Sequence, residues 1–133
     1  MSVVFLDTVG LLALWDKDDQ WHANARTAFE ALVRERRPMV TTTFVLLECG
    51  NAAARRPYRL AVDRLRKQMH DEGTLIAPTA EDWDAGWQSY RNGTPTTAGI
   101  VDQVSFAVLR RIGIANVFTN DRHFRAAGFE VCF

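Results

Sequence analysis

Short apolar segments alternate with longer amphipathic segments along the chain, and this alternation constrains the fold more than any other feature. The apolar segments are rich in β-branched and aromatic residues, as buried strands are, and they cover residues 3–6, 39–42, 74–77, 116–119 and 129–133. In the segments between them, apolar residues recur at intervals of three and four, which is typical of a helix buried on one face. Strands that alternate with helices form parallel sheets covered on both sides. We therefore expect an α/β protein, a three-layer α/β/α sandwich around a mostly parallel sheet.

The helices and the main loop follow from the same pattern. Helices are expected over residues 8–15, 21–36, 43–54, 58–70, 81–90, 101–111 and 122–127. The stretch 92–99 is rich in Gly, Thr and Pro and is the clearest loop. No internal repeat, low-complexity tract or linker interrupts the sequence, so we expect a single domain over residues 1–133.

Composition excludes several classes of protein. The 16 basic side chains equal the 16 acidic ones in number. This balance rules out a protein that binds nucleic acid through a generally basic surface, although it allows a local basic patch. Cys49 and Cys132 are too far apart in sequence for a metal-binding motif, which favours reduced thiols. The apolar start has no basic region before it and is interrupted by Asp7, unlike a signal peptide. We expect a soluble cytoplasmic protein without a membrane-spanning segment.

Acidic side chains remain as the candidates for chemistry, because the common nucleotide-binding, hydrolase and histidine-rich metal motifs are absent. Asp7 directly follows the first strand, and Asp121 follows the strand at 116–119. Asp102 lies at the start of the helix after the 92–99 loop, and Glu48 is an acid within an otherwise apolar helix. Ligands of open α/β sheets bind beyond the carboxyl ends of the strands, so these acids are expected at one edge.

Two interpretations of these acids stay open. Each aspartate also stands where a helix N-cap is favoured, and Glu48 alone could be a partly exposed helix acid. If the four meet, however, their charges repel strongly unless a hard divalent cation such as Mg²⁺ or Mn²⁺ lies between them. The hydroxyl groups of Thr8 and Thr119 would then orient the acids or their waters, although both could equally be capping residues. Such a cluster is suited to cleaving phosphodiester bonds.

The segments around these acids resemble the PIN-domain ribonucleases and, within them, the toxins of VapC-type toxin–antitoxin modules. The resemblance rests on residues 5–8, on the acid in 46–48, and above all on 101–107 together with 119–124. It covers essentially the whole chain. In one departure, residues 99–101 are Gly-Ile-Val, where many relatives carry hydroxyl groups before the third acid, so a hydrogen bond to Asp102 from this segment is in question.

The resemblance implies a fold, an activity and a partner. It implies an α/β/α sandwich and an Mg²⁺- or Mn²⁺-dependent endoribonuclease. Its four catalytic, metal-binding acids map onto Asp7, Glu48, Asp102 and Asp121, of which Asp7 and Asp102 should hold the principal ion. Toxins of this type are usually homodimers that are inhibited by a cognate antitoxin. The RNA target and the number of ions do not follow from the sequence.

Basic and aromatic clusters have two interpretations each. Six basic residues and one acid lie between positions 55 and 67, and Arg55, Arg56 and Arg59 are the candidates for RNA binding; the alternative is a solvated helix face. The four tryptophans suit the hydrophobic core. Alternatively, Trp15 and Trp21 line an antitoxin groove, while Trp83 and Trp87 form a dimer contact.

Two other functions compete with the nuclease. One is a PIN-like domain that binds RNA without cutting it, which the presence of all four acids disfavours. The other is a signalling module with an acidic Mg²⁺ pocket. Such a module needs two adjacent acids after the first strand and a late lysine, whereas Leu6 precedes Asp7 here and the only lysines are Lys17 and Lys67.

Overall fold

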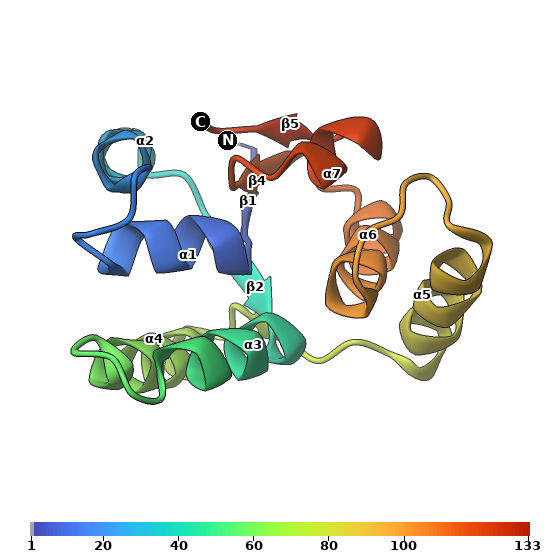
Figure 1. The fold of residues 1–133 in the computed structure, drawn as a ribbon, viewed down its shortest axis with the longest axis horizontal. Coiled ribbons are helices and arrows are strands. Elements are labelled where there is room, and N and C mark those ends of the chain that lie inside the picture. Colours follow the sequence, from blue (N-terminus) through green and yellow to red (C-terminus); the bar gives the residue numbers. More distant parts are fainter. Residues whose placement is uncertain (1) are drawn as a thin grey trace.

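A sheet of five parallel strands runs through the centre of the molecule, with helices on both of its faces (Figure 1). This computed structural model describes residues 2–133. The strands are β1 (Val4–Leu6), β2 (Met39–Thr42), β3 (Leu75–Ile76), β4 (Asn116–Phe118) and β5 (Glu130–Val131). The helices are α1 (Thr8–Trp15), α2 (His22–Arg34), α3 (Thr43–Ala53), α4 (Arg59–Glu72), α5 (Ala80–Asn92), α6 (Ile100–Ile112) and α7 (Arg122–Ala126). The expected α/β/α sandwich is confirmed.

The order in which successive strands are added to the sheet reverses at its middle. The order is β3-β2-β1-β4-β5, so β2 and β3 lie on one side of β1, and β4 and β5 lie on the other. In Figure 1, α1 to α4 lie on one side of the strands, and α6 with α5 outside it lies on the other. Ligands of such sheets bind beyond the carboxyl ends of two neighbouring strands whose following connections lead to opposite sides of the sheet. That point lies at the carboxyl ends of β1 and β4.

The central strand is the most deeply buried part of the chain. Val4, Phe5 and Leu6 are all buried, and β1 pairs with β2 on one side and β4 on the other. A strand covered on both faces by helices has no polar side, which explains its continuous apolar sequence. The residue that follows this strand is thereby held rigidly in place.

Helix α1 packs unusually close to strand β4. A Cβ atom added to Gly10 would collide with the carbonyl oxygen of Phe118, so only glycine fits there. This close approach brings the first turn of α1 against the end of β4. The residues that follow β1 and β4 are therefore neighbours.

Helices α5 and α6 are joined by an ion pair between the buried Asp82 and the exposed Arg111. The guanidinium of Arg111 donates to both carboxylate oxygens of Asp82, at 2.8 to 3.2 Å. This hydrogen bonding to Arg111 lowers the pKa of Asp82 against the opposing effect of its burial. One turn further along, Gly86 allows Val104 of α6 to approach the α5 backbone closely. The contact fixes which face of α5 points outward.

The core interpretation of the tryptophans is wrong for three of the four. Trp15 is half-buried and packs against the core, but Trp21, Trp83 and Trp87 are exposed. Helix α5 lies outside α6 rather than against the sheet, so its aromatic face has no second layer to cover it (Figure 1). Within residues 2–133, no helix combines the length and the apolar character needed to span a membrane.

Candidate metal centre

Asp7 lies directly after the central strand and begins helix α1. Its carboxylate oxygen Oδ2 caps the helix by accepting a hydrogen bond from the Val9 backbone N–H, at 3.3 Å, and also accepts one from the Thr119 hydroxyl, at 2.9 Å. Its other oxygen, Oδ1, is buried and has no hydrogen-bond partner among the described residues. A buried oxygen without a donor is costly for a carboxylate unless a cation supplies the missing interaction.

Asp121 lies after β4 and begins the short helix α7. Its Oδ1 accepts a hydrogen bond from the His123 backbone N–H, at 2.9 Å. Its own N–H donates to the Thr119 hydroxyl oxygen, at 3.1 Å, and that hydroxyl donates to Asp7. Thr119 thus joins the two acids that follow the neighbouring strands.

Asp102 reaches the same space from the other side. It lies in the first turn of α6, but Gly99 occupies the N-cap position, so the capping interpretation of Asp102 is wrong. By contrast, Asp7 and Asp121 both cap helices as well as joining the cluster. No described side chain donates a hydrogen bond to Asp102, in line with the Gly-Ile-Val sequence before it.

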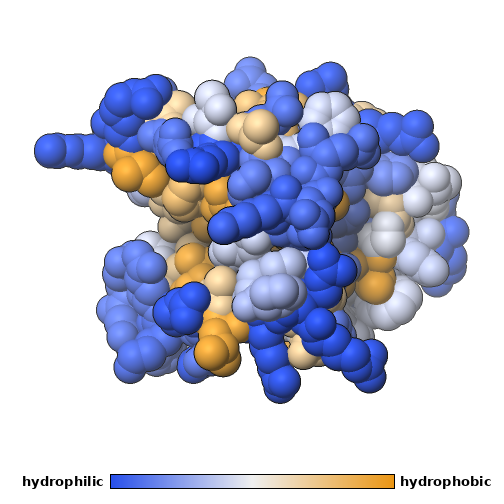
Figure 2. Space-filling model, turned by 60° about the vertical axis from the view of Figure 1, so that its left-hand side comes forward, coloured by the Kyte–Doolittle hydropathy of each residue, from blue (hydrophilic) through white to orange (hydrophobic). Residues whose placement is uncertain are grey.

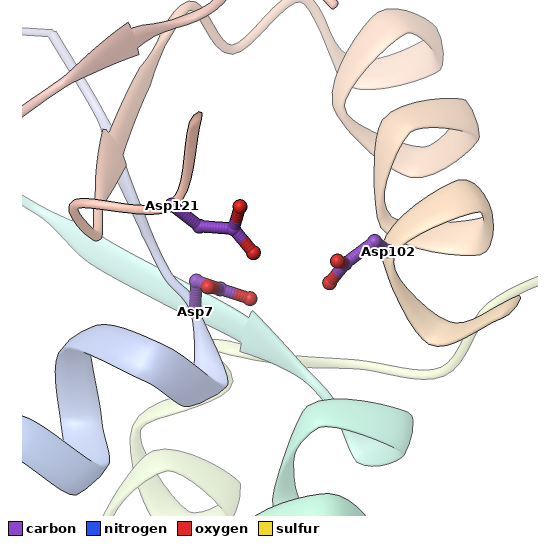
Figure 3. A group of neighbouring side chains, drawn as sticks. All are labelled: Asp7, Asp102 and Asp121. Atoms are coloured by element: carbon purple, nitrogen blue, oxygen red, sulfur yellow. The ribbon is translucent and has the colours of Figure 1, made fainter. Parts of the chain in front are cut away.

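The three aspartates form one cluster. One carboxylate oxygen from each lies within 4.8 Å of the other two. Figure 3 shows Asp7 and Asp121 pointing from the strand ends toward Asp102, which points back from α6. Neighbouring ligands of a six-coordinate Mg²⁺ at about 2.1 Å lie about 3 Å apart, so an inward movement of the three side chains would let all of them bind one ion.

Glu48 lies beside this cluster rather than in it. Its Oε1 accepts a hydrogen bond of 2.6 Å from the Thr8 hydroxyl, and Glu48 is not among the three acids that share the space. Its negative charge nevertheless contributes to raising the pKa of Asp102. Both threonines expected near the acids therefore contact them, Thr119 at Asp7 and Thr8 at Glu48.

The electrostatics of the cluster are unfavourable for three full negative charges. Burial raises the pKa of Asp7 to about 7, and the hydrogen bond from Thr119 opposes this only in part. The pKa of Asp102 rises to about 8, first through burial and then through the charges of Asp7, Asp121 and Glu48. Two unit charges about 5 Å apart repel by roughly 3 kcal/mol at an effective dielectric constant of 20. At neutral pH the cluster therefore favours either protons or a cation.

The donor set fits a hard divalent cation. All the available atoms are carboxylate oxygens, the ligands that Mg²⁺ and Mn²⁺ prefer, and Asp7 Oδ1 has no competing partner. No described histidine or cysteine belongs to the cluster, which argues against a zinc site. The geometry thus supports a site for one such ion.

The arginines expected to bind RNA lie away from the acids. Arg55, Arg56 and Arg59 are exposed near the turn between α3 and α4. Arg56 forms an ion pair of 3.2 Å with Asp16, which ends α1, whereas Asp7 begins it. Because α1 has eight residues, the two ends are roughly 12 Å apart. The structure does not bring these arginines to the acids.

Thr96, in the loop before α6, links two helices through hydrogen bonds that no sequence pattern predicts. The buried Gln103 of α6 donates from Nε2 to the Thr96 carbonyl, at 2.8 Å. The Thr96 hydroxyl is hydrogen-bonded to Nδ1 of His123 in α7, at 2.7 Å. Gln103 is the neighbour of Asp102, and the backbone of His123 binds Asp121. Thr96 therefore links the two helices that carry these acids, a contact between distant segments.

Replacing Thr96 by valine is expected to weaken Mn²⁺ binding by about tenfold, the lower end of the range for residues that orient metal ligands. Valine keeps the size of the side chain but removes the hydrogen bond to His123. Isothermal titration of the purified protein with MnCl₂ measures the change. Thr96→Ser should bind almost as the wild type, and so should Thr97→Val, at the exposed neighbouring position. Wild-type affinity in Thr96→Val would show that the link does not position the acids.

Comparison with known families identifies a close match. The family model of the PIN domain matches residues 4–130. The 23S rRNA-specific endonuclease VapC20 of Mycobacterium tuberculosis (strain CDC 1551 / Oshkosh) is 30% identical over 132 residues, which cover 96% of this chain and 95% of VapC20.

Solved structures show the same fold. The crystal structure of M. tuberculosis VapC20, described as a Sarcin-Ricin loop cleaving toxin, matches with a TM-score of 0.79 at 27% identity and covers 95% of each chain. DNA-bound VapBC from Salmonella typhimurium matches with a TM-score of 0.64 at 18% identity, over 98% of this chain and 97% of the other. At that lower identity the likeness concerns the fold.

Proposed function

Because the chain belongs to the PIN domain family, we propose that it is a divalent-metal-dependent endoribonuclease that acts as the toxin of a toxin–antitoxin pair. The observation that carries this proposal is the convergence of Asp7, Asp102 and Asp121, with a buried Asp7 oxygen that lacks a partner. The similarity to VapC20, which is named as an RNA endonuclease, supports RNA as the substrate class.

In this proposal Asp7 and Asp102 hold the principal ion, Mg²⁺ or Mn²⁺, and Asp121 completes the set. When bound, such an ion acidifies the attacking water and offsets the negative charge that develops on the phosphate. Thr119 fixes one oxygen of Asp7 and leaves the other without a hydrogen-bond partner among the described residues. Thr8 fixes Glu48, whose carboxylate would orient the water that attacks the phosphorus atom and displaces the leaving oxygen.

The basic residues extend the proposal to substrate binding. We propose that Arg55, Arg56 and Arg59 contact the RNA backbone at some distance from the cut, since a site roughly 12 Å away is within reach of the next few nucleotides. Arginine side chains suit this role because the planar guanidinium binds phosphate through two hydrogen bonds.

The antitoxin is proposed to bind on the side of α1 to α4. A hollow of about 410 Å³ lies between the end of α1 and the α3–α4 turn, and Trp15, Arg56 and Tyr58 line it. Trp21 is not among its lining residues. Figure 2 shows this side of the molecule hollowed between two lobes, with hydrophobic residues bordered by hydrophilic ones. Such a mixed surface suits a protein segment with apolar anchors.

Incubation with RNA tests the proposal directly. With Mg²⁺ or Mn²⁺ the purified protein should cut total RNA that includes 23S rRNA into discrete fragments, and EDTA should abolish the cutting, because the acids alone cannot neutralise the phosphate. DNA of matched sequence serves as the control for substrate class. Binding of RNA without cutting, in either metal, would favour the RNA-binding alternative; cutting that persists in EDTA would contradict the role of the acids.

A further inference from the structure

An ion pair joins the end of α1 to the turn between α3 and α4. Nη2 of Arg56 lies 3.2 Å from Oδ2 of Asp16, although the two residues are 40 positions apart in the chain. The same guanidinium lies over the ring of Tyr58, 5.7 Å from the ring centroid. All three residues line the hollow at this end of α1. One of the three arginines proposed to bind RNA therefore already has an acidic partner within the protein.

Local hydrogen bonds hold Asp16 independently of Arg56. The backbone N–H of Asp16 donates to the Leu12 carbonyl, at 2.9 Å, and closes the last turn of α1. Its Oδ1 accepts a hydrogen bond of 3.0 Å from the Asp18 backbone N–H, a local contact that fixes the carboxylate without a distant partner. Only Oδ2 contacts Arg56. The arginine is consequently the member of the pair that can leave.

The position of Asp16 in α1 does not by itself favour a carboxylate. The C-terminal end of a helix carries a partial negative charge, which disfavours acidic side chains. Asp16 nevertheless ends α1, Asp18 and Asp19 follow it, and no basic residue lies in the last turn of the helix. Of these three acids, only Asp16 forms an ion pair within residues 2–133. The contact with Arg56 is therefore what distinguishes Asp16 from its acidic neighbours.

A phosphate group can replace Asp16 as the partner of Arg56. The two side chains are 45% exposed for Arg56 and 21% for Asp16, and ion pairs at such positions contribute little to stability. Arg56 donates to Asp16 from Nη2 alone, whereas a phosphate accepts two hydrogen bonds from the planar guanidinium. Tyr58 packs against the core, and its ring holds the guanidinium at the hollow. An RNA phosphate that reaches the hollow thus offers Arg56 a stronger partner than Asp16 does.

We propose that Asp16 competes with RNA for Arg56 and thereby lowers the affinity of the protein for RNA. In the free protein its carboxylate occupies the guanidinium, and bound RNA replaces that single hydrogen bond with a phosphate contact. Arg55 and Arg59 form no ion pair within the described part of the chain, so the competition concerns Arg56 alone. Asp16 is then a specificity-determining residue, because only an RNA whose backbone reaches the hollow gains the contact with Arg56. The inference rests on the proposed RNA substrate.

Binding of RNA in EDTA tests the competition without cleavage. Fluorescence anisotropy of a fluorescein-labelled fragment of 23S rRNA gives the dissociation constant. Asp16→Asn should bind about threefold to fivefold more tightly than the wild type, near the upper end for one exposed ion pair. Asparagine keeps Oδ1 for Asp18 but loses the charge that holds Arg56. The matched control is Asp18→Asn, which removes the same charge from an exposed neighbour outside the pair and should change the constant by less than about twofold.

A double variant shows whether the effect passes through Arg56. Arg56→Gln should weaken RNA binding by roughly threefold to tenfold, because one phosphate contact is lost. In that background Asp16→Asn should gain no more than Asp18→Asn does, since no guanidinium remains to be released. Circular dichroism checks that each variant is folded.

Two outcomes separate this inference from the proposed function. A gain from Asp16→Asn that is the same with and without Arg56, or no larger than that from Asp18→Asn, would overturn the competition and leave the RNA substrate intact. A wild type that binds neither this fragment nor total RNA would overturn the proposed substrate, and the competition with it.

Discussion

Replacing Asp102 by asparagine is expected to lower the rate of RNA cleavage by at least roughly a hundredfold to a thousandfold, the scale for removing one electrostatic catalytic group, and to leave the protein folded. Asparagine has the same shape but cannot supply the anionic oxygen that a divalent ion needs. The same change should make the metal-free protein more stable. Asp102 has no hydrogen-bond donor among the described side chains, and burial together with the charges of Asp7, Asp121 and Glu48 disfavours its ionised form.

Initial rates of RNA cleavage and urea unfolding in EDTA, both at pH 8, measure the two effects. The unfolding free energy of Asp102→Asn should exceed that of the wild type by on the order of a few kcal/mol, because each unit of the raised pKa of Asp102 corresponds to about 1.4 kcal/mol. Asp71→Asn, which changes an exposed acid of α4, should alter neither quantity. Full cleavage activity in Asp102→Asn would exclude Asp102 from the active site. Lower stability in EDTA would show that its charge is already compensated by the protein.

The metal-free protein is expected to lose stability as the pH rises from about 4 to about 8. The pKa values of Asp7 and Asp102 are about 7 and about 8 in the folded protein, against 3.8 for the ordinary carboxyl group. Between these values the folded state holds protons that the unfolded state has released, so each further pH unit favours unfolding. Above the folded pKa values both states are ionised and the loss stops. For two coupled groups the total is on the order of several kcal/mol.

Mn²⁺ should reverse this loss at pH 8 and have little effect at pH 5, because protons compete with the ion for the same oxygens. A concentration of about 100 times the dissociation constant stabilises a protein by about 2.7 kcal/mol. Urea unfolding at both pH values, with Mn²⁺ or EDTA, measures the difference, and Asp102→Asn should reduce it. Equal stabilisation by Mn²⁺ at pH 5 and pH 8 would place the bound ion away from these acids.

Much of the fold follows from local sequence patterns. Buried strands such as 3–6 and their neighbouring helices are signalled by apolar periodicity, and their alternation is enough to predict a covered parallel sheet. The strand order could not be predicted, because several orders are compatible with the same alternation of strands and helices. The close approach of Gly10 to Phe118, which joins α1 to β4, is a contact over more than 100 residues that no local pattern announces.

The residues of the candidate site were likewise predictable only in part. Asp7 and Asp121 were predictable because each lies just beyond the end of a strand, and strand ends of a parallel sheet share one edge. The role of Thr96 was not, since it depends on His123 and Gln103 from two other segments. The core interpretation of Trp83 and Trp87 was wrong, although an amphipathic helix is usually buried on its aromatic face. Here the buried face is instead the one with Asp82 and Gly86.

Three carboxylates from distant segments are expected to form one divalent-cation site. Crystals soaked in MnCl₂ and measured for anomalous scattering at the manganese absorption edge test it directly. We expect an anomalous peak at coordination distance, roughly 2.0–2.5 Å, from oxygens of Asp7, Asp102 and Asp121 together. A cluster without manganese in those crystals, or a peak confined to other residues, would contradict it.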